Sequence, residues 1–105
     1  MNVKQIAVAG WPFGDPPESP AVTTIHVTTG RMPILQVSHD PDEDGESTWS
    51  FHCRTIPFSM ADAQLVRLDT VVSIDPSVCE VAGLDVGCSA TREAIGGKWA
   101  IHRED

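Results

Sequence analysis

The residues whose types and spacing most resemble a chemical site are three aspartates at alternate positions, Asp40, Asp42 and Asp44, followed by Gly45. Calcium ions prefer oxygen ligands, and this spacing of carboxylates before a glycine is typical of the first half of a calcium-binding loop. The second half is missing, because Phe51 stands at the twelfth position, where a bidentate glutamate is needed. Three interpretations therefore stay open: a calcium-like site, a solvated hairpin tip, or an acidic surface that docks a basic partner.

The charge of the chain favours the docking interpretation. The 105 residues include 15 Asp and Glu against 7 Lys and Arg, which gives a net charge of -8. A surface this acidic repels phosphate backbones and anionic lipids, so we expect a basic protein as partner and neither nucleic acid nor a membrane. Aromatic side chains often anchor such contacts. The predicted partner-binding residues are Asp42, Glu43, Asp44, Glu46, Trp11 and Phe13.

Two further side-chain combinations could carry chemistry. His39 and His52 flank the acidic segment, and together with nearby carboxylates they could hold a transition metal if they approached across a hairpin. Cys88 could act as a nucleophile only with a base, and His102 is the residue that could supply one in three dimensions. Both combinations are weaker than the acidic cluster.

Two sequence strings imitate catalytic motifs without meeting their requirements. Ser38, His39 and Asp40 are consecutive, and neighbours on a strand point to opposite faces, so they cannot form a relay. The segment Gly96-Gly97-Lys98 is too short for a phosphate-binding loop. We therefore predict a protein that is not an enzyme and carries no cofactor.

The elements that must position these residues are short. Residues 21–29 predict a strand, with a helical turn over 25–29 as the alternative, and residues 33–54 predict a β-hairpin whose loop is DPDEDGES. Residues 64–68 predict a further strand, and Asp69 and Asp75 each predict the start of a short helix. Turns or a short helix are expected over 90–95, followed by an irregular tail in which Trp99 packs. The predicted fold is α+β: a small, mainly antiparallel sheet with two short helices on one face.

The chain has the length of a single domain. Proline and glycine in GWPFGDPPESP exclude a helix there, so we predict an arm over 1–20 and a single α+β domain over 21–105. Three cysteines and no apolar leader at the N-terminus favour free thiols and a cytoplasmic location.

Several of these features occur together as a set. They are the strand PILQVSHD, the turn DPDEDG, the W-x-F motif of Trp49 and Phe51, the unit LVRLDTVVSIDPSV, and the later Gly87 and Arg92. Over roughly residues 20–95 the chain resembles a family of small bacterial domains of unknown function, and more distantly the immunity-protein-like domains that neutralise toxins of competing bacteria. The resemblance implies an α+β fold and a protein-binding role, with no catalytic residues. Arg54 and Cys88 depart from the family's pattern, which has a glycine and an aromatic residue at those places.

Overall fold

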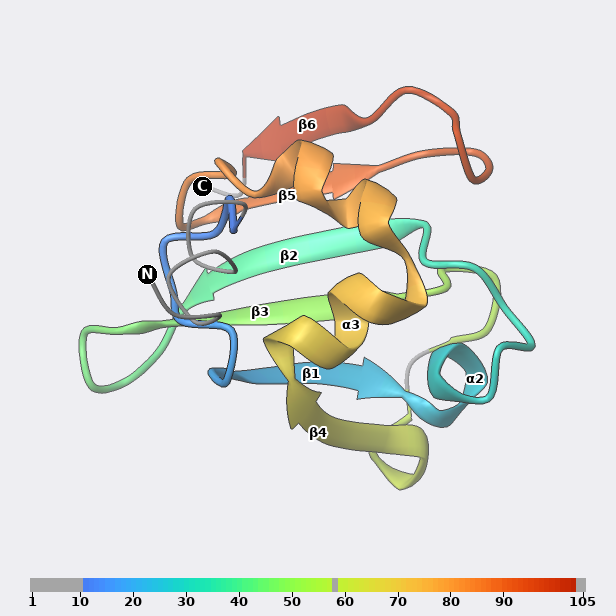
Figure 1. Cartoon of the computed structure of the whole chain (residues 1–105), viewed down its shortest axis with the longest axis horizontal. Helices are drawn as coiled ribbons and strands as arrows, with labels where there is room; N and C mark the ends of the chain where they lie inside the picture. The colour runs from blue at the N-terminus through green and yellow to red at the C-terminus, as the bar shows by residue number, and fades with distance from the viewer. Residues whose placement is uncertain (1–10, 58, 104–105) are drawn as a thin grey trace, which may run out of the picture.

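A six-stranded mixed sheet forms the centre of the computed structural model, which describes residues 11–57 and 59–103 (Figure 1). The strand order is β4-β1-β3-β2-β5-β6. The strands are β1 (Pro20–Thr24), β2 (Gln36–Pro41), β3 (Ser47–His52), β4 (Ala63–Arg67), β5 (Cys88–Thr91) and β6 (Ala100–Arg103). The helices are α2 (Ile25–Thr28), α3 (Leu68–Ile74) and the 3-10 helices η1 (Met60–Asp62) and η2 (Pro76–Val81).

The predicted α+β class is confirmed, and so is the mainly antiparallel sheet. Every neighbouring pair of strands is antiparallel except β1 and β3, which run parallel, with Ala21 opposite Trp49. The hairpin predicted over 33–54 is present as β2 and β3, in a register that sets Val37 opposite Phe51. The predicted strand over 21–29 ends at Thr24, and α2 follows it, as the alternative reading of that segment allowed.

The predictions for the C-terminal segment were right for a turn near residue 95 and for the packing of Trp99, and wrong in missing two strands. Residues 88–91 form β5, and residues 100–103 form β6 in place of an irregular tail. The sequence of β5, Cys-Ser-Ala-Thr, has no strong strand propensity, and its backbone is extended because it pairs with β2 on one side and β6 on the other.

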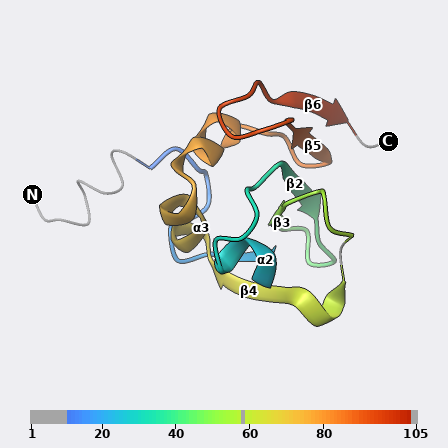
Figure 2. The ribbon, with the colours of Figure 1, turned by 90° about the vertical axis from the view of Figure 1, so that its right-hand side faces the viewer.

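The hydrophobic core lies between one face of the sheet and the helices α3 and η2, which lie on the same side of it in Figure 2. Alternation along the strands directs Val37, Trp49 and Phe51 towards this core. From the helices, Leu68, Val71 and Val78 pack against them and are fully buried.

A buried arginine ties the C-terminal part of the sheet to the start of η2. The guanidinium of Arg92, 2% exposed as a residue, donates from Nε and Nη2 to Ile34 O at 3.1 and 2.9 Å. It also donates from Nη2 to Asp75 Oδ2 at 2.6 Å and from Nη1 to Ser77 Oγ at 2.8 Å. The half-buried Trp99 ring lies 4.2 Å from the guanidinium carbon, so Trp99 packs as predicted.

The described part of the predicted arm is built into the domain. Ser19 O accepts from Leu68 N–H at 2.8 Å, Pro17 O accepts from Asp69 N–H at 2.9 Å, and Phe13 is a core residue. Residues 11–20 therefore pack as part of the domain, and the predicted boundary at residue 20 does not separate them from it. Residues 1–10 of the predicted arm lie outside the described part of the chain. Among the described residues, no helix has the length and apolar character that a membrane span needs.

Candidate functional site

The acidic loop between β2 and β3 is held in one conformation by its own hydrogen bonds. Asp42 N–H donates to Glu46 O at 2.9 Å, and Asp42 Oδ1 accepts from the backbone N–H groups of Asp44 at 2.9 Å and Glu46 at 3.0 Å. Gly45 has a φ of 81°, a left-handed conformation that glycine adopts without strain. The predicted partner-binding residues Asp42, Glu43, Asp44 and Glu46 are thus brought together, all exposed, on an ordered loop.

The segment that precedes β1 faces this loop and is fixed by aromatic contacts. The Trp49 indole donates from Nε1 to Asp15 Oδ2 at 3.0 Å, and the Trp11 indole donates to Asp15 O at 2.7 Å. Phe13 meets Trp49 edge to face, with ring centroids 5.0 Å apart. Asp15 is therefore held in place by two tryptophans.

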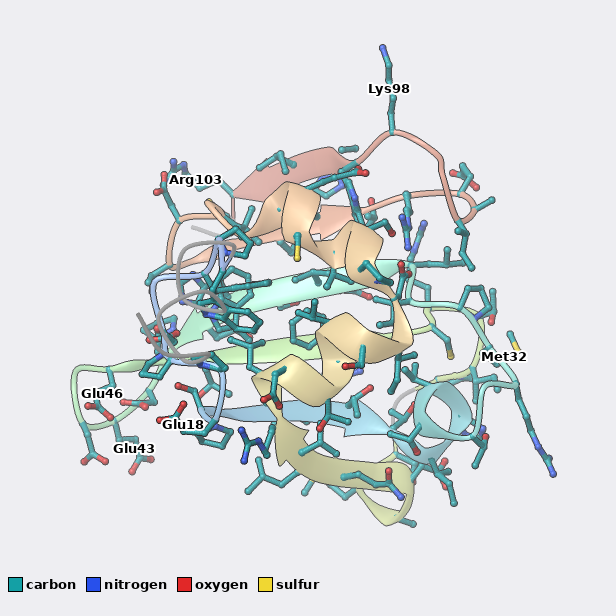
Figure 3. All side chains as sticks on the ribbon, viewed as in Figure 1. Glu18, Met32, Glu43, Glu46, Lys98 and Arg103 are labelled. Atoms are coloured by element: carbon teal, nitrogen blue, oxygen red, sulfur yellow. The ribbon has the colours of Figure 1, made fainter. Side chains whose placement is uncertain are left out.

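A groove of about 540 Å³ separates the two segments. One wall is formed by residues 15–20, the other by the loop and the adjoining strand ends between 41 and 48, and Val86 completes the lining. Asp15, Asp42 and Glu46 contribute three carboxylates to the lining, and none of the residues between 11 and 103 that line it is Lys, Arg or His. Figure 3 shows Glu18, Glu43 and Glu46 at this same end of the molecule.

His39 anchors the base of the loop. Its ring stacks on Trp49 with centroids 3.9 Å apart, Nδ1 lies 2.7 Å from Leu84 O, and Nε2 lies 2.7 Å from Ser47 Oγ. Because a carbonyl oxygen only accepts, Nδ1 carries the proton, and in the neutral ring Nε2 accepts from the Ser47 hydroxyl. Both ring nitrogens are thereby engaged in holding the strand ends at the groove.

The two aromatic residues predicted to contact a partner are less exposed than the carboxylates of the acidic loop. Phe13 is 5% exposed and belongs to the core, so it cannot touch a partner directly, and its assignment to the binding surface was wrong. Trp11 is half-buried and packs against the core, with its indole N–H already bonded to Asp15. Both residues position the groove wall.

The structure does not assemble the predicted metal sites. Across residues 11–57 and 59–103, no group of three or more His, Cys, Asp or Glu side chains is arranged to hold a metal ion, and Asp40, Asp42 and Asp44 form no such group. His39 pairs with Trp49 on the core face, whereas His52 pairs with Gln36 on the opposite face, so the two histidines do not meet across the hairpin. Burial lowers the pKa of His52, and the nearby Asp40 charge offsets part of that effect.

The alternation of side chains along a strand also contradicts the hypothesis that Cys88 is a nucleophile with His102 as its base. Cys88 is 3% exposed and pairs with Arg103, while His102 pairs with Ser89, so the thiol and the imidazole point to opposite faces of the sheet. His102 Nε2 instead lies 2.9 Å from Thr91 Oγ1. Cys79 is also unsuited to nucleophilic attack, because burial raises its pKa.

Asp15 is the groove residue that sequence reasoning missed. It lies in the Asp-Pro-Pro segment assigned to the arm, where nothing but the neighbouring Trp11 and Phe13 signalled attachment to the domain. Comparison of the chain with protein-family models, with curated proteins and with solved structures found no match, so the description of the site rests on its geometry.

Proposed function

We propose that this chain is a non-enzymatic protein-interaction module whose acidic groove binds a basic surface of a protein partner. The observation that carries the proposal is the groove itself: three carboxylates line a concave surface, and none of the described residues in its lining is a cation. A Lys or Arg side chain of a partner would meet opposite charge on both walls, Asp15 on one and Asp42 and Glu46 on the other.

The arginine ion pairs involve other carboxylates than those of the groove. Arg67 pairs with Asp69, Arg92 with Asp75 and Arg103 with Asp85. Within the described part of the chain, none of the ion pairs includes Asp15, Glu18 or a carboxylate of the acidic loop. Among the described residues, these carboxylates therefore have no ion-pair partner, although Glu18 interacts electrostatically with Arg67. Their negative charge would steer a basic partner towards the groove during diffusional encounter.

The order of the loop and its opposite wall also supports a binding role. A loop already closed by Asp42 and a wall already held by Trp49 lose little conformational freedom on binding, which favours affinity. The resemblance to immunity-protein-like domains points to the same class of function, with a toxin as the basic partner, occlusion as the mode of action and the cytoplasm as the location.

The test begins with capture of partners from the source cell's lysate at low and high salt. The captured protein is then purified, and its association rate is measured with two matched double variants. Glu43→Gln with Glu46→Gln removes two charges of the acidic loop, and Glu80→Gln with Glu93→Gln removes two exposed charges elsewhere. We expect the first pair to slow association at low salt by about tenfold and the second to have little effect.

Equal rates for the two double variants would show that the groove is not the binding surface. A rate that does not fall as salt is added would contradict electrostatic steering by the loop.

A further inference from the structure

The strand β4 forms one edge of the sheet and has a free side. It pairs with β1 alone, in an antiparallel register that sets Leu65 opposite Val22. The Leu65 side chain is 71% exposed, although leucine is usually buried. In Figure 1, β4 is the lowest strand of the sheet, and the segment η1 that leads into it bends below its right-hand end.

The hydrogen-bond pattern shows which backbone groups β4 presents outward. Leu68 N–H donates to Ser19 O, so residues 19 and 68 form a hydrogen-bonded pair at the end of this ladder. Hydrogen-bonded pairs alternate along antiparallel strands, so Val66 and Gln64 point their N–H and C=O groups towards β1. The backbone groups of Ala63, Leu65 and Arg67 therefore point away from the sheet. Pro20 lies opposite Arg67 and has no N–H to donate, which is consistent with a non-hydrogen-bonded pair at this position.

This outward pattern is symmetric about Leu65. An antiparallel copy of the same strand, centred on Leu65, sets Leu65 opposite the partner's Leu65 and Ala63 opposite the partner's Arg67. All three outward residues then find hydrogen-bonding partners. The two exposed leucines cover each other, and no like charges stand directly opposite, because Arg67 is the one charged residue of β4.

The charge of β4 is compatible with self-association. Two copies of a chain with net charge -8 repel each other, and this repulsion is weakest where the surfaces in contact carry no carboxylate. The strand AQLVR carries none, and Arg67 is held by a bidentate contact with Asp69, at 3.0 and 2.8 Å. A surface groove of about 430 Å³ beside Leu65 and Val66 offers room for the side chains of an added strand, and its one carboxylate, that of Glu18, interacts electrostatically with Arg67 in the same lining.

We propose that a second copy of this chain binds at β4, by antiparallel pairing about a two-fold axis at Leu65, to give a continuous twelve-stranded sheet. A single strand pair buries little surface, so the dimer forms at high micromolar to millimolar protein. The acidic groove and the groove beside β4 share Pro20, but the carboxylates Asp15, Asp42 and Glu46 line only the acidic groove. The proposal does not depend on the function assigned to the acidic groove.

The test combines molecular mass with residue-resolved amide exchange on the full chain. Sedimentation equilibrium from micromolar to millimolar protein should show the mass rising towards twice the monomer mass. Exchange at the Leu65 amide, fast in dilute solution, should slow at least about tenfold at high concentration, while exchange at Gln64 and Val66 stays slow throughout.

Two matched variants locate the contact. Leu65→Asp sets two carboxylates opposite each other and should weaken self-association at least about tenfold. Ile101→Asp makes the same change at β6, where Ile101 is 58% exposed, and should leave it unchanged. Both substitutions are at exposed positions, and circular dichroism confirms folding. The proposal is overturned if the mass stays monomeric at millimolar protein. It is also overturned if Ile101→Asp disrupts the dimer, or if β4 pairs only with a different protein.

Discussion

Trp49 and Asp15 are 34 residues apart in sequence, and the indole N–H of the first donates to the carboxylate of the second at 3.0 Å. This hydrogen bond connects the central strand β3 to the segment before β1, so one contact both closes the core and sets a wall of the acidic groove. The Trp49 residue is 3% exposed, which leaves its indole few other partners if Asp15 is lost.

We therefore predict that Asp15→Ala lowers the free energy of unfolding by about 1–3 kcal/mol, because a buried donor loses its acceptor. Asp15→Asn keeps an oxygen acceptor and should recover most of the loss while still removing the charge from the groove. Urea denaturation followed by tryptophan fluorescence measures both variants. If Asp15→Ala unfolds at the same urea concentration as the wild type, the indole contact contributes nothing to stability.

The backbone of the acidic loop gives a second prediction. Gly45→Ala should cost about 1 kcal/mol, because a φ of 81° is unfavourable for a residue with a Cβ, although no atom lies within 4 Å of the added carbon. Gly83→Ala is the matched control: it also meets no atom within 4 Å, and its φ lies outside the left-handed region. Thermal melts of the two variants should separate them, and equal melting temperatures would contradict the role assigned to Gly45.

The buried cation gives the largest predicted effect. Arg92→Met removes four donated hydrogen bonds and leaves Asp75 without its ion-pair partner, so we expect a loss of about 3–5 kcal/mol. The exposed pair of Arg103 and Asp85, at 3.7 Å, supplies the comparison, and Arg103→Met should change the unfolding free energy by less than about 1 kcal/mol.

A double variant separates the arginine's own contribution from the penalty on its partner. Arg92→Met combined with Asp75→Asn should be more stable than the sum of the two single losses predicts, because no unpaired charge then remains. Additive losses in urea denaturation would show that the two side chains are not coupled.

The pKa of His52 predicts how stability depends on pH. Because burial holds the folded pKa below 6.5, the unfolded chain binds the proton first as pH falls. The contribution of His52 to stability is therefore fully present above pH 6.5 and is lost as pH falls from 6.5 through the folded pKa. An NMR titration of the folded chain should give a His52 pKa below 6.5, and His52→Gln should reduce the loss of stability over this range. A titration midpoint at or above 6.5 would contradict the prediction.

Sequence reasoning succeeded where the signal was local. The hairpin of β2 and β3 joins neighbouring segments through a turn rich in Asp and Gly, and Trp49 and Phe51 alternate with polar residues. The Asp75-Pro76 start of η2 was also predictable, because the Asp75 side chain accepts from Ser77 N–H and proline occupies the first helical position. Both signals act over a few residues.

Sequence reasoning failed where distant pairing decides the structure. The extended backbone of β5 comes from its two neighbours, one of them about fifty residues earlier. The groove shows the same limit: its loop carboxylates were predicted from their clustering, whereas Asp15 reaches the site only through the long-range contact with Trp49. No local pattern in a proline-rich segment reports such a contact.

The position of β1 between β3 and β4 has a consequence for synthesis of the chain. On the ribosome β1 emerges before β3 and β4, the strands that pair with it. Its backbone N–H and C=O groups therefore stay without their sheet partners until those strands are translated. The groove wall before β1 is fastened by Leu68 and Asp69, which follow β4. The acidic groove is completed later still, because Val86 belongs to its lining, and a nascent chain halted between the loop and Val86 has the loop but lacks the finished site.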